Sequence, residues 1–264
     1  MSEPGSSSAN TMSNSKFCHR EINELEEALA YWYEVSPGQR VAAHEREALI
    51  GMVADLFGYQ LLQLGELGDE QGHLVHCPVQ RKTLITRRTA VAYQDVIRAD
   101  AQQLPVAPDS VDAVILVHTL DFSPDPHQVL REVERVLIAE GRMIVIGFNP
   151  FSLWGLWRLF GRWRGGIPWC GHFLSYPRLN DWLTLMGFGI ERMDVMEFRP
   201  PTRSGQFDAV ERLGRRVWPM LAGIYVVRAV KRVSRVTPVR QHWSRLRVLG
   251  PRAIEPTARE VNDV

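Results

Sequence analysis

Three short segments combine chemically capable residues with positions directly after predicted strands: Gly65-Glu66-Leu67-Gly68, Asp100-Ala101 and His118-Thr119. In open α/β sheets, ligands bind at the carboxyl ends of the strands. Glycines let a backbone approach a ligand closely, because they lack a Cβ atom. An ionised aspartate only accepts hydrogen bonds, so it pairs well with an exocyclic amine. These segments therefore hold our candidate binding residues.

The elements that must position these segments alternate between apolar strands and helices. Tyr59–Leu64 is almost continuously apolar, as expected of a parallel strand that is buried on both faces. Strand Val111–Val117, helix Pro126–Leu137, a glycine stop at Gly141 and strand Met143–Gly147 follow later. The other predicted helices are Glu21–Tyr33, Gln39–Phe57 and Tyr176–Met186. The other strand candidates are His73–Val79, Arg81–Thr86, Val91–Arg98, Gly189–Phe198 and Gly223–Val230.

The block from Asp100 to Phe148 resembles the second half of the Rossmann-like domain of class I S-adenosylmethionine (SAM)-dependent methyltransferases. The Asp-Ala pair, the Leu-Pro segment after it and the helix pattern Leu-x-Glu-x-x-Arg-Val-Leu at Leu130–Leu137 occur in the family's order. The resemblance is to the methyltransferase type 11-like domain of uncharacterised bacterial members. It implies an α/β fold with a seven-stranded, mostly parallel sheet, helices on both faces and an antiparallel last strand.

The resemblance also implies a division of the chain. Residues 1–20 are expected to form a disordered tail and residues 21–58 an N-terminal helical cap. The methyltransferase-like domain would span residues 59–230, and residues 231–264 would form a basic, irregular C-terminal tail.

Family membership would make SAM the cofactor and would assign roles to the candidate residues. Gly65, Glu66 and Gly68 would lie along its methionine moiety. Asp100 would accept a hydrogen bond from the adenine amino group, while the Ala101 N–H meets a ring nitrogen. His118 and Thr119 would line the methyl-donor pocket, although His118 could instead be a satisfied core histidine.

The chain departs from the family pattern at several positions. Gln63 stands where an acid is usual, and Leu67 and Asp69 occupy glycine positions. No acidic residue is evident at the end of the second strand, where ribose hydroxyls are commonly bound. Asp121 and Asp125 lie in a Ser/Pro/Asp cluster that favours a turn, so we interpret both as turn residues.

Methyl transfer is a displacement on the cofactor's sulfonium, for which the protein mainly supplies positioning. The sequence therefore identifies no catalytic residue. Our lead hypothesis is SAM-dependent methylation of a small or lipid-like acceptor. The alternatives are a non-catalytic methyltransferase-fold binding module, and an RNA or protein methyltransferase that uses the arginine-rich C-terminal region.

The segment Leu153–Trp163 alternates large apolar residues with arginines. As a helix it could pack on the domain, close over an apolar substrate, or lie in the headgroup zone of a membrane. The same residues could stack on nucleobases, but no RNA-binding motif supports that reading.

Bulk properties exclude several classes of function. The net charge of +1 makes no global case for nucleic acid. The three cysteines are widely spaced, predict free thiols and lack zinc-ligand spacing, so no metal site is expected. The N-terminus lacks the apolar segment of a signal peptide, and no run of about 18 apolar residues exists. We therefore expect a cytoplasmic protein.

Overall fold

A computed structural model describes residues 22–67, 72–88, 95–161, 167–201 and 221–232. The chain up to Val233 forms one compact unit, to which all these residues belong. The predicted tail at residues 1–20, residues 233–264 of the tail predicted at 231–264, and Gly68 lie outside the described residues, whereas Lys231 is the last residue of the strand Ile224–Lys231.

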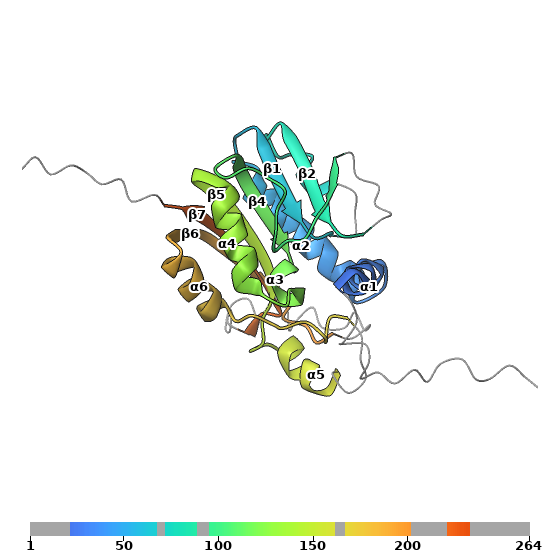
Figure 1. The fold of residues 1–264 in the computed structure, drawn as a ribbon. Coiled ribbons are helices and arrows are strands. Elements are labelled where there is room, and N and C mark those ends of the chain that lie inside the picture. Colours follow the sequence, from blue (N-terminus) through green and yellow to red (C-terminus); the bar gives the residue numbers. More distant parts are fainter. Residues whose placement is uncertain (1–21, 68–71, 89–94, 162–166, 202–220, 233–264) are drawn as a thin grey trace, which may run out of the picture. The chain divides into compact units, whose positions relative to one another are not determined.

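The centre of this unit is a seven-stranded sheet in the order β3-β2-β1-β4-β5-β7-β6 (Figure 1). Six strands, β1 to β6, run in the same direction, while β7 pairs antiparallel with both β5 and β6. The predicted fold class, including the antiparallel last strand, is confirmed. The strands are β1 (Gln60–Leu64), β2 (Arg81–Thr86), β3 (Val96–Arg98), β4 (Val111–Val117), β5 (Leu137–Phe148), β6 (Phe188–Met196) and β7 (Ile224–Lys231).

Helices cover both faces of the sheet because the buried strand residues alternate between two cores. Ala113, Ile115 and Val117 of β4 belong to the core beneath α1 (Ile22–Glu34) and α2 (Gly38–Val53). The alternate residues of β4 belong to the core beneath α4 (Pro126–Val136) and α6 (Tyr176–Leu185). The short helix α3 (Thr119–Phe122) and α5 (Leu153–Gly161) follow β4 and β5, at the carboxyl ends of these strands (Figure 1).

Two predictions about the elements, the glycine stop at Gly141 and the strand His73–Val79, differ from the structure. Strand β5 begins at Leu137, directly after α4, so Gly141 lies within the strand and does not end the helix. The register between β4 and β5 shifts near this glycine, which explains why the strand pattern is interrupted in the sequence. The predicted strand His73–Val79 is wrong: Gly72–Leu74 form one turn of 3₁₀ helix, and Cys77 and Val79 are buried in loop structure.

None of the helices within the described part of the chain has the length and hydropathy needed to cross a bilayer.

Candidate functional site

A pocket opens at the carboxyl ends of the parallel strands. Its empty volume is about 680 Å³, which includes open solvent at its mouth. Its walls come from α1, the loops after β1, β2 and β3, and the end of β4. The lining includes six predicted site residues, namely Gly65, Glu66, Asp100, Ala101, His118 and Thr119.

The loop after β1 approaches the pocket through a true glycine position. Gly65 has a φ of +84°, and a Cβ atom there would lie 2.5 Å from the carbonyl oxygen of Val117. Gln63, which replaces the usual acid, is buried and donates to the Gly65 carbonyl at 3.0 Å. Leu67, which stands at a glycine position of the family pattern, is 1% exposed and packs into the core below α2.

Two carboxylates converge on the end of β2, where the sequence showed no acid. Thr86 Oγ1 lies 2.9 Å from Glu26 Oε2, which α1 supplies, and 3.1 Å from Glu66 Oε1 in the loop after β1. All three residues line the pocket. Acidic groups therefore reach the usual ribose position from other elements. Sequence reasoning missed Glu26 because it is 60 residues from Thr86 along the chain.

Arginines on the segment after β2 pair with two of the pocket acids. Arg88 forms an ion pair with Glu66, and Arg87 forms one with Asp100. The pKa of Glu66 lies above its ordinary value, mainly because the carboxyl is buried. The nearby Glu26 carboxylate also raises this pKa, whereas Arg88 and Thr86 lower it. Glu66 and Asp100 thus face the pocket in ion pairs with Arg88 and Arg87. A polar ligand would have to displace these arginines from the carboxylates or bind beside them.

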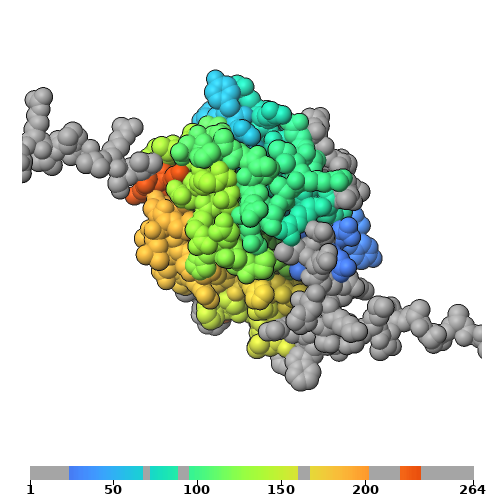
Figure 2. All heavy atoms as spheres, viewed as in Figure 1, coloured from blue at the N-terminus to red at the C-terminus, as the bar shows by residue number. Residues whose placement is uncertain are grey.

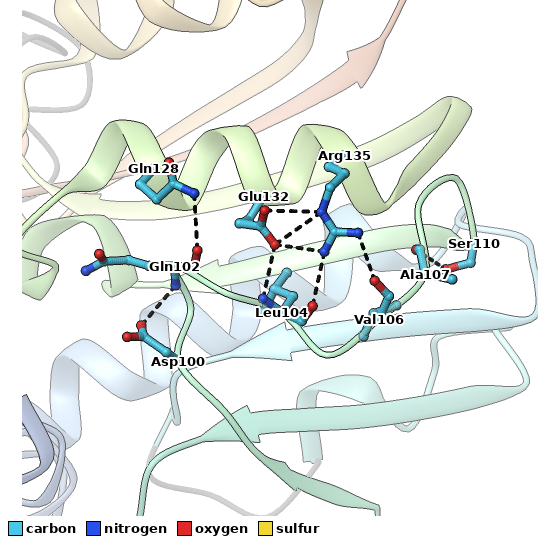
Figure 3. Close-up of polar contacts among 9 residues, drawn as sticks. All are labelled: Asp100, Gln102, Leu104, Val106, Ala107, Ser110, Gln128, Glu132 and Arg135. Carbon is cyan, nitrogen blue, oxygen red and sulfur yellow. Dashed lines mark hydrogen bonds and ion pairs between the residues drawn. The ribbon is translucent and has the colours of Figure 1, made fainter.

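Asp100 and Ala101 lie where the sequence predicted, in the turn after β3. The Asp100 carboxylate accepts from the Gln102 N–H at 2.9 Å, which fixes the turn (Figure 3). Ile85, Ala99 and Ala101 give the pocket apolar walls beside this carboxylate. An acceptor beside flat apolar walls suits a purine amino group.

The helix α4 fastens this turn through the two polar residues of its Leu-x-Glu-x-x-Arg-Val-Leu pattern (Figure 3). Glu132 accepts from the Leu104 N–H at 3.1 Å, and Arg135 donates to the carbonyl oxygens of Leu104 at 3.1 Å and Val106 at 2.9 Å. Glu132 and Arg135 are also paired at 2.8 Å. The pattern therefore supports the binding loop, although neither side chain lines the pocket.

The sequence left open whether His118 lines the pocket or is a satisfied core histidine. Both hold, since it lines the pocket and is fully buried. Its Nε2 atom lies 2.7 Å from Glu45 of α2, and its Nδ1 atom lies 2.8 Å from Asp121 of α3. Tyr33 of α1 donates to the other oxygen of Glu45 at 3.0 Å. The ring also stacks on Phe148 with a centroid separation of 4.0 Å.

The two carboxylates hold the imidazole of His118 in its protonated form. Burial alone would lower the pKa of His118, but the charges and hydrogen bonds of Glu45 and Asp121 raise it to about 9. Burial also raises the pKa of Asp121, against the effect of His118. Because both ring nitrogens are engaged, His118 is not free to act as a base.

The assignment of Asp121 as a turn residue is wrong. It lies in α3, is 1% exposed and also accepts from the Phe148 N–H at 3.0 Å. Asp125 instead caps α4, accepting from the Gln128 N–H at 3.0 Å. Glu45 and Tyr33 were missed because a lone charge or phenol on an amphipathic helix has no sequence feature that distinguishes it from a surface group.

The remaining site predictions concern metals and cysteines. Among the described residues, no group of three or more His, Cys, Asp or Glu side chains could hold a metal ion. Cys77 is a free, buried thiol. Cys170 is disulfide-bonded, so the prediction of free thiols is wrong for this residue.

Part of this arrangement matches a known family. Residues 57–145, which include β1 to β4 and most of β5, match a family model described as a methyltransferase domain. Such a match indicates SAM as the cofactor, and the loop of Gly65, the acids at β2 and the turn at Asp100 supply suitable groups for it.

The relatives agree on the fold. The chain is 33% identical over 150 residues to the uncharacterised protein YafS of Escherichia coli, covering 57% of this chain and 61% of that protein. It thus spans about three fifths of this relative's length. A SAM-dependent methyltransferase of Thermotoga maritima, named as a possible histamine N-methyltransferase, aligns with a TM-score of 0.52 and 18% identity over 84% of this chain and all of that chain.

A geranyl diphosphate methyltransferase, solved with geranyl diphosphate and sinefungin, aligns with a TM-score of 0.51. Its identity to this chain is 13%, and the alignment covers 74% of this chain and 80% of that chain. At these identities, the solved structures establish the fold only.

Proposed function

We propose that this protein is a SAM-dependent methyltransferase whose acceptor is a small, largely apolar or lipid-like molecule. The observation that supports it most is the convergence of Gly65, the acid pair at Thr86 and the Asp100 turn on one pocket. SAM, when bound, supplies the electrophilic methyl group. The residues of the chain bind and orient the reactants, and the chemistry needs no acid or base from His118.

The assigned roles follow from the chemistry of each group. Gly65 leaves room for the polar end of the cofactor. Glu26 and Glu66 can accept from vicinal ribose hydroxyls, and Asp100 from the adenine amine.

The character of the acceptor is inferred from the apolar part of the lining. Leu25 and Leu29 of α1, together with Phe122 and Pro124, also line the pocket and offer apolar contact. The similarity to a geranyl diphosphate methyltransferase is compatible with an apolar acceptor, whereas the similarity to the Thermotoga protein leaves a small amine open.

Calorimetry with SAM and S-adenosylhomocysteine tests the cofactor half of the proposal. We expect micromolar binding of both, with Asp100→Ala weakening SAM by about 1–3 kcal/mol because the acceptor for the adenine amine is lost. Asp95→Asn removes an exposed carboxylate outside the pocket and should leave binding unchanged.

Absence of binding at millimolar SAM would favour a non-catalytic binding module, in which the pairs Arg87–Asp100 and Arg88–Glu66 close the pocket. Transfer of a labelled methyl group to a total lipid extract, compared with RNA and protein fractions, tests the acceptor half. Labelling confined to RNA or protein would instead support a macromolecular methyltransferase.

A further inference from the structure

Helix α5 presents an apolar face to solvent. The exposed residues described for this helix, and Phe151 two positions before it, are all large and apolar: Phe151, Leu153, Leu156, Trp157 and Leu159, with exposed fractions from 41% to 68%. We call these five residues the α5 face. A surface helix normally turns polar residues outward, so this face is the reverse of the usual pattern. Figure 2 shows this segment at the lower edge of the molecule.

The opposite side of α5 accounts for its attachment to the domain. Trp154 is fully buried, packs edge-on against Trp32 of α1 and donates from Nε1 to the Arg199 carbonyl at 2.9 Å. Arg158 donates to the Trp169 carbonyl at 3.3 Å and lies 5.0 Å from the centre of the Phe173 ring. The fold is therefore satisfied without the α5 face, which remains available for a partner.

The charge around the helix indicates the chemistry of that partner. From Asn149 to Asn180, the segment that contains α5, the sequence has four arginines and no aspartate or glutamate. Exposed leucine and tryptophan in an acid-free, arginine-containing region are the composition of an interfacial membrane helix, which binds by apolar burial and by attraction to anionic headgroups. Apolar patches of this kind on a soluble surface usually mark an interaction site.

The position of α5 relative to the pocket supports the same partner. Trp154 lies 5.8 Å, between ring centres, from Trp169, which comes two residues before Gly171. A Cβ atom on Gly171 would lie 3.1 Å from the ring of Phe122, which lines the pocket. The α5 face is thus on the same end of the sheet as the pocket, a few side chains away from it (Figure 1).

We propose that the α5 face binds the protein peripherally to the surface of an anionic lipid bilayer. The apolar residues would enter the boundary between headgroups and acyl chains, and the arginine-rich segment would attract the acidic headgroups. This inference does not depend on methyl transfer, because the contact needs neither SAM nor an acceptor.

Sedimentation of the full chain with vesicles tests it. The vesicles contain phosphatidylcholine with or without phosphatidylglycerol, at low and high salt. The test variant Leu156→Ser/Trp157→Ser changes two residues of the face. The control Phe57→Ser/Leu185→Ser changes two apolar residues elsewhere on the surface. They are 75% and 86% exposed, which is more than either residue of the test variant.

We expect wild type and control to partition onto phosphatidylglycerol vesicles, with weaker binding at high salt and at least tenfold weaker binding by the test variant. Circular dichroism confirms that both variants are folded, and calorimetry with S-adenosylhomocysteine shows separately whether the cofactor site is functional.

The proposal fails if wild type does not sediment with these vesicles, if the test variant binds as wild type does, or if binding depends on neither lipid charge nor salt. It also fails if gel filtration shows that the test variant dissociates a dimer, since the face would then join two copies of the chain.

Discussion

At the scale of single residues, the pocket replaces one expected carboxylate with two that come from different elements. Glu26 and Glu66 meet at Thr86 Oγ1, at 2.9 and 3.1 Å. A hydroxyl has only one proton to donate, so it cannot satisfy both acids fully. A vicinal diol brings two further donors to the same point, which makes this pair a suitable receptor for ribose.

We predict that Glu66→Gln weakens S-adenosylhomocysteine binding about tenfold, which corresponds to about 1.4 kcal/mol. The reason is the loss of a charge-assisted hydrogen bond to a ribose hydroxyl. Calorimetry with wild type and variant measures it. An analogue without both ribose hydroxyls serves as the control, because its affinity should not change. Equal losses for both ligands would mean that Glu66 supports the loop and does not contact ribose.

The buried imidazole at His118 predicts a pH dependence of stability. The pKa of His118 is raised from 6.5 to about 9 in the folded protein, so folding favours the protonated form. Its stabilisation is complete below about pH 6.5 and is lost as pH rises through 9. We expect the free energy of unfolding to fall by a few kcal/mol across this interval.

Denaturant unfolding at pH 6, 7.5 and 9.5 measures this change. Glu45→Gln removes one of the two partners that raise the pKa of His118, so its stability should vary less over the same range. A variant with the slope of wild type would show that His118 is not the titrating group.

At the scale of elements, α4 supports the binding turn as well as the core. Its buried residues Val129, Leu130, Val133 and Val136 pack on the sheet. Glu132 and Arg135 meanwhile hold the loop between β3 and β4 through the hydrogen bonds at Leu104 and Val106. The turn at Asp100 is consequently positioned by a helix that follows it in the sequence.

We predict that Arg135→Met lowers the melting temperature and weakens S-adenosylhomocysteine binding, because two carbonyl oxygens lose their donor. Leaving a buried polar group without a hydrogen bond costs about 1–3 kcal/mol. Arg131→Met is the matched control on the same helix, since the Arg131 side chain is 60% exposed. Thermal unfolding and calorimetry give the two readouts. Binding that survives unchanged despite a lower melting temperature would contradict the role in the loop.

The elements show where sequence reasoning succeeds and where it fails. The strands β1, β4 and β7 are apolar runs that only a doubly covered sheet can bury, so they could be predicted. The turn at Asp100 was found through resemblance. Glu45 could not be assigned, because its partner His118 is 73 residues away and local pattern contains no long-range contact. Trp154 and Trp157 differ in burial within one helical turn, which hydrophobicity alone does not reveal.

At the scale of the whole folded unit, α2 is held by charged clusters on two sides. Glu45 contacts His118 below the pocket. Arg40 and His44 contact Glu197, which follows β6 and is fully buried, at 3.2 and 2.7 Å. The helix thereby connects the pocket with the edge of the sheet that is formed by β6 and β7, and movement of either end would break a buried ion pair.

Glu197 gives a prediction for acidic pH. Burial would raise its pKa, but the hydrogen bonds from His44 and Arg40 outweigh burial and lower the pKa below its ordinary value of 4.5. Its contribution to stability is therefore present above pH 4.5 and is lost as pH falls through the lower, folded-state pKa. Glu197→Gln should cost about 3–5 kcal/mol at pH 7, since it leaves the Arg40 charge without its carboxylate. The difference between variant and wild type should shrink at pH 3.5, as wild type loses the same charge.

Asp194→Asn, at a partly exposed pair with Arg192, should change stability little at either pH. Denaturant unfolding at both pH values decides it: a cost for Glu197→Gln that is the same at pH 7 and pH 3.5 would mean that packing, and not the ion pairs to α2, is what this residue contributes.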